Sequence, residues 1–231
     1  RDWVKASLED LVPVSAGRFV VHGQHDRERI APNKLGIEIE AALAFGTGHH
    51  GTTRGCLLLL DQVLKAWRPR RVLDLGTGTG VLAIAAARAL HERVLASDID
   101  PSSVQVAREN ARLNVSGHLV QAIRATGFAA PQFAAAAPFD LVLANILANP
   151  LRQLATPMAR HLAPSGLVIL SGLLTPQAAS VIAAYRARGL VPVRLAQGRR
   201  ASAAHGTLVL DDANSTAVLI NGRIGCGVGE V

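Results

Sequence analysis

From about residue 71 the chain alternates two kinds of hydrophobic pattern. Apolar runs of four or five residues are typical of strands buried on both faces, and longer segments with apolar positions every three to four residues are typical of helices that pack on a sheet. Such alternation predicts a doubly wound α/β fold, because each helix crosses back to a parallel neighbouring strand. The expected strands are 72–75, 94–97, 119–123, 141–144 and 167–170, and the expected helices are 81–90, 102–114, 151–162 and 176–188.

The end of this pattern is different. Residues 191–195 and 207–210 are two further expected strands with no helix between them. A strand that returns without a crossover enters antiparallel, as in a hairpin. We therefore predict a Rossmann-like, seven-stranded, mainly parallel sheet whose last strand, 207–210, is antiparallel. Residues 211–231 leave the pattern and are expected to form a tail of unknown role.

The region before the regular pattern is more polar. Residues 1–34 contain one short strand candidate, 18–22, and we interpret them as a linker or the remnant of a preceding domain. Residues 37–40 alternate apolar and acidic positions, which predicts a strand that leads into a glycine-rich loop. A helix follows, with Thr52 or Thr53 as its N-cap. The expected domain organisation is a linker or remnant at 1–34, the main domain at 35–210 and the tail at 211–231.

Composition narrows the class of protein. The 231 residues are 49% hydrophobic, 18% charged and 3% aromatic, which fits a globular domain with an aliphatic core and excludes a disordered chain. The net charge of +7 is compatible with ribonucleoprotein surroundings, which are negatively charged. However, the chain has no block of like charges and too few aromatic residues for a base-stacking platform. We therefore expect no direct nucleic-acid readout.

Cysteines and apolar segments indicate the compartment. Cys56 and Cys226 lie far apart with no zinc spacing, so neither a disulfide scaffold nor a structural metal is indicated. Every apolar stretch ends well before the ~20 residues that a bilayer requires, and no signal-peptide pattern is present. We expect no membrane segment and a cytoplasmic protein.

A glycine-rich turn follows the strand 72–75. Gly76, Gly78 and Gly80 are spaced G-x-G-x-G, whereas a dinucleotide fingerprint requires G-x-G-x-x-G. A phosphate-binding loop is also excluded, because residues 76–87 contain no Lys or Arg. The turn therefore has no evident pyrophosphate site. Taken alone, the glycines also fit a tight turn in any fold of this kind.

Asp98 stands at the end of the next strand, beside this turn in the expected sheet. An adenosine ligand without phosphates needs an acceptor for its two ribose hydroxyls, and Asp98 is well placed to accept from both. The alternative role, capping the following helix, already suits Asp100 before Pro101. Together with the glycines, Asp98 favours a pocket for S-adenosylmethionine.

Asn145 ends the expected strand 141–144. On a doubly wound sheet, chemistry is normally placed at the carboxyl ends of the strands, so a polar amide there is a candidate catalytic residue. Asn145 is also suited to cap the next helix, and the sequence leaves both interpretations open.

Four blocks of the sequence resemble class I S-adenosylmethionine-dependent methyltransferases, and within them the PrmA type, which acts on ribosomal protein L11. The block AFGTGHHGTT is specific to that family, whereas the glycine turn alone indicates only the superfamily. The resemblance covers roughly residues 1–210, and it implies that the chain lacks most of the family's N-terminal substrate-recognition domain. The blocks are 44–53, 74–86, 98–101 with Asn110 and Asn114, and 144–147.

The resemblance implies S-adenosylmethionine as cofactor and a set of residues around it. Asn145 is the implied catalytic residue, because its side-chain oxygen accepts amine hydrogens without a carboxylate charge that would stabilise the ammonium form. No metal is expected, since His49 and His50 have no carboxylate at ligand spacing. The implied cofactor-contacting residues are Thr53, Gly76, Asp98 and Asn145, with Thr47, Gly48 and Gly78 lining the same site.

The reaction implied by the resemblance is methylation of lysine side-chain or N-terminal amines of ribosomal protein L11, its expected partner. Two alternatives stay open. Basicity favours methylation of amino groups on nucleic-acid bases, although enzymes of that kind have an aromatic residue near the Asn, and residues 145–148 read NILA. The other is a catalytically silent assembly factor that binds the same cofactor.

Overall fold

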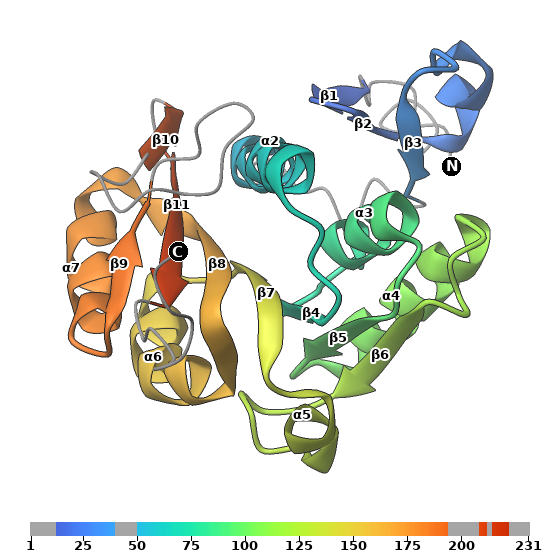
Figure 1. Ribbon diagram of the computed structural model, residues 1–231. Helices are drawn as coiled ribbons and strands as arrows, with labels where there is room; N and C mark the ends of the chain where they lie inside the picture. The colour runs from blue at the N-terminus through green and yellow to red at the C-terminus, as the bar shows by residue number, and fades with distance from the viewer. Residues whose placement is uncertain (1–12, 40–49, 194–207, 212–213, 222–231) are drawn as a thin grey trace, which may run out of the picture.

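The computed structural model describes residues 13–39, 50–193, 208–211 and 214–221, which form two sheets and the helices around them (Figure 1). The smaller sheet has the order β1-β2-β3, with β1 and β2 antiparallel and β2 and β3 parallel. A 3₁₀ helix, η1, connects β2 to β3. These elements are β1 (Val14–Ala16), β2 (Phe19–His22), η1 (Gln24–Arg29) and β3 (Leu35–Glu38).

The larger sheet is the centre of the α/β unit. Its order is β10-β11-β8-β7-β4-β5-β6, with β9 paired to β11. Strands β4 to β8 are parallel, and β11 is antiparallel to β8, which confirms the predicted fold class. The strands are β4 (Val72–Leu75), β5 (Val94–Asp98), β6 (Val120–Arg124), β7 (Phe139–Asn145), β8 (Leu162–Leu174), β9 (Leu190–Pro192), β10 (Leu208–Asp211) and β11 (Asn214–Asn221).

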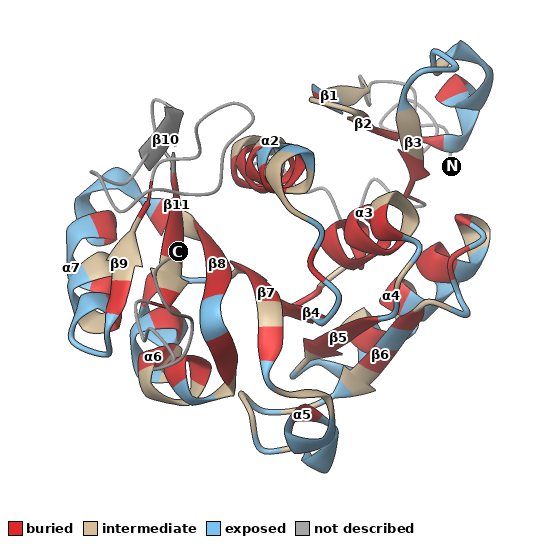
Figure 2. Cartoon of the chain, viewed as in Figure 1, coloured by how far each residue is buried: buried red, intermediate tan, exposed pale blue. Residues whose placement is uncertain are grey.

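Helices cover both faces of this sheet, and buried residues line the contacts (Figure 2). Successive strand residues point to opposite faces, so Val72 packs with α2, α3 and α4, whereas Leu73 packs with α5, α6 and α7. The same alternation in β11 sends Val218 to the first cluster and Leu219 to the second. The helices are α2 (His50–Ala66), α3 (Val81–Leu90), α4 (Pro101–Leu113), α5 (Pro131–Ala136), α6 (Ala148–His161) and α7 (Thr175–Arg186).

The C-terminal strands correct one prediction. The antiparallel strand beside β8 is β11, not residues 207–210, and β10 pairs only with the outer side of β11. The physical reason is that Ala217, Val218 and Leu219 are buried and cover both hydrophobic clusters at once. Residues 214–221, which we expected to lie outside the α/β pattern, are therefore part of the sheet.

The N-terminal region also differs from expectation. Residues 13–39 form the three-stranded sheet, whereas the sequence indicated only single strands at 18–22 and 37–40. Buried residues of this sheet, such as Phe19 and Ile37, join the cluster that contains α2 and α3. Thr52 and Thr53 lie inside α2 rather than at its N-cap. Among the described residues, no helix is long and apolar enough to cross a membrane.

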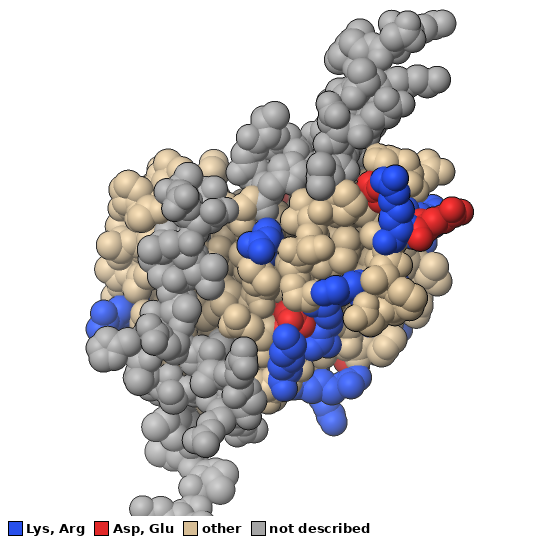
Figure 3. All heavy atoms as spheres, turned by 90° about the horizontal axis from the view of Figure 1, so that it is seen from above, with Lys and Arg blue, Asp and Glu red and all other residues tan. Residues whose placement is uncertain are grey.

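Charged side chains on the face seen from above lie in separate groups (Figure 3). Several basic residues pair with acids: Arg18 and Lys65 both contact the carboxylate of Asp61, at 2.6 and 2.7 Å, and Arg27 contacts Glu38 at 2.6 Å. The positive charge of the described surface in this view is therefore not gathered into one continuous basic patch.

Candidate functional site

The carboxyl edge of the large sheet holds a cavity of about 770 Å³. It opens where β4, β5 and β7 end, the position at which doubly wound folds bind ligands. Its walls combine backbone and apolar surface with polar side chains, among them one carboxylate, that of Asp98, and one guanidinium, that of Arg160. Lining residues from these three strand ends are Gly76, Asp98, Ile99, Ile146 and Leu147, and Phe128 lies across from them.

The glycine turn after β4 requires glycine for two different reasons. Gly76 and Gly78 have φ of 73° and 53°, a backbone conformation that side chains disfavour. A Cβ on Gly76 would lie 2.2 Å from the Cγ2 of Ile146, so this glycine lets the loop after β7 approach. A Cβ on Gly78 would meet nothing within 4 Å, which leaves space beside the turn for a ligand to approach the backbone.

Asp98 fixes the turn and lines the cavity. Its Oδ2 accepts a hydrogen bond from the Gly78 N–H at 2.9 Å, and its Oδ1 accepts one from the Asp100 N–H at 3.0 Å. Asp100, not Asp98, caps α4, by accepting from the backbone of Ser102 and Ser103. Because a carboxylate has about four acceptor positions, Asp98 keeps lone pairs for a ligand in the cavity.

Asp74 lies beneath the same turn, fully buried on β4. Its Oδ2 accepts from the Thr77 hydroxyl at 2.6 Å and from the Ala83 N–H at 3.0 Å, which ties the turn to the start of α3. Its Oδ1 has no hydrogen-bond partner among the described residues. Burial, with a smaller effect from the Asp98 charge, raises the pKa of Asp74 to about 6. The sequence resemblance includes Asp74 only as part of the block 74–86, although an acid inside an apolar strand itself indicates a functional or structural role.

Asn145 stands at the end of β7, directly before Ile146, which lines the cavity. Its Nδ2 donates to the Thr53 Oγ1 of α2 at 3.3 Å. Its Oδ1 is buried and has no partner among the described residues. Leu147 is the N-cap of α6, so Asn145 does not cap that helix. The amide therefore presents an unused acceptor oxygen at the carboxyl edge of the sheet.

Gly172, near the end of β8, supports the loop that follows Asn145, and we did not predict this from the sequence. Its φ is 79°, and a Cβ there would lie 2.5 Å from the backbone oxygen of Ile146. Only a glycine lets β8 pass this close to the Asn145–Ile146 backbone.

Comparison with known proteins gives the family of the chain. Residues 1–198 match the family model described as ribosomal protein L11 methyltransferase (PrmA). The chain belongs to the PrmA family. It is 82% identical over 194 residues to a ribosomal protein L11 methyltransferase of Bradyrhizobium diazoefficiens, and 78% identical over 194 residues to one of Rhodopseudomonas palustris. Each alignment covers 84% of this chain and 66% of the relative, so the matched part spans just under two thirds of those proteins.

A solved structure agrees with the PrmA assignment. The ribosomal protein L11 methylase of Lactobacillus delbrueckii subsp. bulgaricus superimposes with a TM-score of 0.75 at 25% sequence identity. The superposition covers 90% of this chain and 98% of that one.

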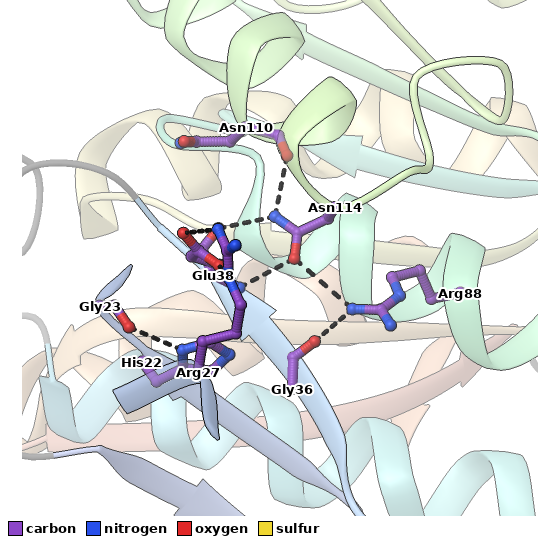
Figure 4. Close-up of polar contacts among 8 residues, drawn as sticks. All are labelled: His22, Gly23, Arg27, Gly36, Glu38, Arg88, Asn110 and Asn114. Atoms are coloured by element: carbon purple, nitrogen blue, oxygen red, sulfur yellow. Dashed lines mark hydrogen bonds and ion pairs between the residues drawn. The ribbon is translucent and has the colours of Figure 1, made fainter. Parts of the chain in front are cut away.

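The two asparagines of the third PrmA-like block connect the glycine turn to the small sheet, and Figure 4 shows the contacts of Asn114 with Asn110, Glu38 and Arg88. Asn110 donates to the backbone oxygen of Thr79 at 2.9 Å. The Asn114 amide pairs with both backbone groups of Glu38, accepting from its N–H at 2.8 Å and donating to its oxygen at 2.6 Å. Arg88 adds bonds to the Gly36 oxygen and to Asn114. This network fixes β3 to α3 and α4.

The residues that the PrmA resemblance indicated fall into two groups. Thr47 and Gly48 lie outside the described residues, so their placement stays a prediction. Of the others, Gly76 and Asp98 line the cavity and Gly78 binds Asp98. Thr53 and Asn145 bind each other at the end of β7 and are not among the lining residues. In the part of the chain that the structure describes, no group of three or more His, Cys, Asp or Glu side chains is placed to hold a metal.

Proposed function

We propose that this chain transfers methyl groups from S-adenosylmethionine to lysine side-chain or N-terminal amines of ribosomal protein L11. The observation that carries this proposal is the Asn145 Oδ1, a buried acceptor with no partner among the described residues, at the edge that also carries Asp98 and the glycine turn. Membership of the PrmA family supports the substrate. The proposed place of the reaction is the cytoplasm, where ribosomal proteins are made.

The residues present fit the cofactor. Asp98 would accept from the ribose hydroxyls, and the open space beside Gly78 would admit the ligand to the backbone of the turn. The adenosine would lie among apolar walls that include Ile99 and Leu147, which are 62% and 70% exposed and so available for contact. When bound, the cofactor supplies an electrophilic methyl group on a sulfonium.

The chain's own contribution is to hold a neutral amine in line with that methyl group. A lysine with an ordinary pKa near 10.4 is only about 0.04% neutral at pH 7. The Asn145 Oδ1 would accept a hydrogen of the neutral amine and orient its lone pair, and as an uncharged group it would not favour the ammonium form. Thr53 would hold the Asn145 amide in that orientation through its hydroxyl.

We also propose a role for residues 13–39 within the expected domain organisation. The Asn114 amide and the Arg88 guanidinium hold β3 on the main unit, through the Glu38 backbone and the Gly36 oxygen. Residues 13–34, the described part of the segment interpreted as a linker or remnant at 1–34, would then be a fixed connector, which would present a substrate-recognition part of the protein at a constant angle. The division into 1–34, 35–210 and 211–231 stays a prediction.

The proposed function is tested by incubating the chain with isotope-labelled S-adenosylmethionine and, in separate reactions, ribosomal protein L11, ribosomal RNA and DNA. We expect label on L11, and mass spectrometry would assign it to lysine or N-terminal amines. Label on nucleic acid would instead support the base-methylation alternative. Cofactor binding without label on any substrate would support the silent assembly factor. The variant Asn145→Ala is the matched negative control for each reaction.

A further inference from the structure

Two buried hydroxyls and one backbone carbonyl form a chain of contacts behind Asn145. The Ser171 hydroxyl of β8 donates to the backbone oxygen of Thr52 in α2 at 3.3 Å. It also lies 2.7 Å from the Thr216 hydroxyl of β11. Either hydroxyl can be the donor in this second contact, which is the shorter of the two. Ser171 and Thr216 are 0% and 2% exposed, so this chain is shielded from water.

An irregularity in the β8–β11 pairing places Thr216 in this chain. Ser215 pairs with Leu173, whereas Ala217 pairs with Leu170, so β8 has one extra residue at this point. Thr216 consequently stands opposite Ser171 and Gly172, at the carboxyl end of β8. A bulge of this kind redirects a side chain, and here it directs a hydroxyl towards the second turn of α2.

The second turn of α2, at Gly55, rests directly on Thr216. A Cβ on Gly55 would lie 2.6 Å from the Thr216 Oγ1, so the helix backbone and the hydroxyl are in close contact. Two residues before Gly55, Thr53 reaches Asn145 through its own hydroxyl. Asn145 is also the β7 partner of Ser171 in the sheet. The position of Thr53 relative to Asn145 therefore depends on what lies beneath this turn.

We propose that Thr216 is a positioning residue, which acts through Ser171 and the first turn of α2 to set the orientation of the Asn145 amide. The inference rests on the proposed function for the role of Asn145. Thr216 lies beyond residue 198, where the match to the PrmA family model ends. In this chain, a strand outside the matched region thus completes the support of the proposed catalytic amide.

A double-mutant cycle tests the proposal in the full chain. Thr216→Val keeps the shape of the side chain and removes the hydroxyl, whereas Thr216→Ser keeps the hydroxyl. We expect Thr216→Val to lower turnover at saturating S-adenosylmethionine about three- to tenfold, and Thr216→Ser to restore most of it. In an Asn145→Ala background, Thr216→Val should have no further effect. Additive losses would overturn the proposal, because they would mean that Thr216 acts only on the fold.

The control is Ser116→Ala, which removes another buried hydroxyl, one that bonds the Ala111 oxygen far from this edge. It should leave turnover unchanged. If Thr216→Val does not fold, Ser171→Ala removes the middle group of the same chain of contacts and enters the same cycle.

A spectroscopic measurement separates this inference from the proposed function. The side-chain amide signals of Asn145 are assigned in an NMR spectrum by their loss in Asn145→Ala. We expect Thr216→Val to shift them and Ser116→Ala to leave them in place. Unchanged signals in Thr216→Val would overturn the positioning role. If the wild-type chain methylates nothing, the proposed function fails, and these signals still decide whether Thr216 positions the amide.

Discussion

The two halves of the proposed catalytic edge are held in different ways. On the side of the glycine turn, Asp74 and Asp98 bind mainly backbone groups between residues 77 and 100. On the opposite side, Asn145 is held by Thr53, and the support behind it comes from Ser171 and Thr216. The first half is thus built from one continuous stretch of chain, and the second from four segments far apart in the sequence.

This difference separates two tasks. A ligand that must be bound in one orientation suits a turn fixed by local backbone bonds, because few other parts of the fold can disturb it. An amine that must be aligned for transfer needs an acceptor without a competing partner, and the Asn145 Oδ1 has none among the described residues. That freedom requires buried, long-range contacts to hold the rest of the amide in place.

The largest expected effect is at Gly172, on the side of the edge that carries Asn145. Gly172→Ala should cost about 2–5 kcal/mol of unfolding free energy, because a left-handed conformation and overpacking against the Ile146 backbone add together. Gly189→Ala is the matched control, since Gly189 has φ of 85° but nothing within 4 Å of its Cβ position. It should lose only about 1–2 kcal/mol. Equal losses in urea denaturation would show that contact with Ile146 adds nothing.

The next largest effect concerns Asp74, the buried acid beneath the glycine turn. Between its ordinary pKa of 3.8 and its folded value of about 6, Asp74 is protonated in the folded state and ionised in the unfolded state. The free energy of unfolding therefore falls as pH rises through this range, by about 3 kcal/mol in total. The Asp74→Asn side chain does not ionise, so the free energy of unfolding of this variant does not fall with pH in this way. Between pH 3.5 and pH 7, denaturation experiments should therefore show it rising by about 3 kcal/mol relative to that of the wild type.

Asp100 provides the control of opposite sign. Hydrogen bonds from Ser102 lower its pKa, so its contribution to stability is present above the ordinary pKa and is lost as pH falls. Asp100→Asn should therefore become less stable relative to wild type as pH rises. The same slope in both variants would contradict the assignment of a raised pKa to Asp74.

Ligand binding sharpens the comparison at Asp98. Asp98→Ala should weaken S-adenosylmethionine binding by about 1.5–3 kcal/mol, the cost of losing hydrogen bonds to a charged acceptor, as measured by titration calorimetry. The control Asp140→Ala removes a carboxylate that also accepts two backbone N–H groups, those of Arg70 and Arg71, before β4. It should leave affinity unchanged. Wild-type affinity in Asp98→Ala would remove Asp98 from the cofactor site.

The smallest expected effect is kinetic. Asn145→Ala should keep the fold and lower methyl transfer at saturating cofactor at least about tenfold, or some 1.4 kcal/mol on the barrier. Asn149→Ala, which removes an exposed amide in the first turn of α6, is the control and should keep wild-type turnover. If Asn145→Ala also keeps it, the free oxygen has no role in transfer.

The same contrast explains how much the sequence alone could predict. Residues 72–75 and 81–90 were predicted with the bounds that β4 and α3 have, because apolar periodicity and the glycine turn are local signals. The capping role of Asp100 could be predicted for the same reason, and the structure confirms it. The proposed site roles of Thr53, Asp98 and Asn145 stay predictions, although the structure joins Thr53 to Asn145 and places Asp98 in the cavity wall.

The contacts of Ser171, Gly172 and Thr216 could not be predicted. They depend on a bulge in the β8–β11 pairing and on a register that no local pattern specifies. The small N-terminal sheet was missed for a similar reason, since β3 is fixed by the amide of Asn114, 76 residues away in the sequence.

Strand β11 also bears on how freely such a fold can change its ends. A strand that pairs with β8 at this position needs few sequence features. It needs small and branched apolar residues, as at Ala217 to Leu219, and a hydroxyl at the bulge. Many short segments meet those requirements by chance. We therefore expect changes of sequence within β11 to be tolerated as long as apolar residues stay at 217–219 and a hydroxyl stays at position 216.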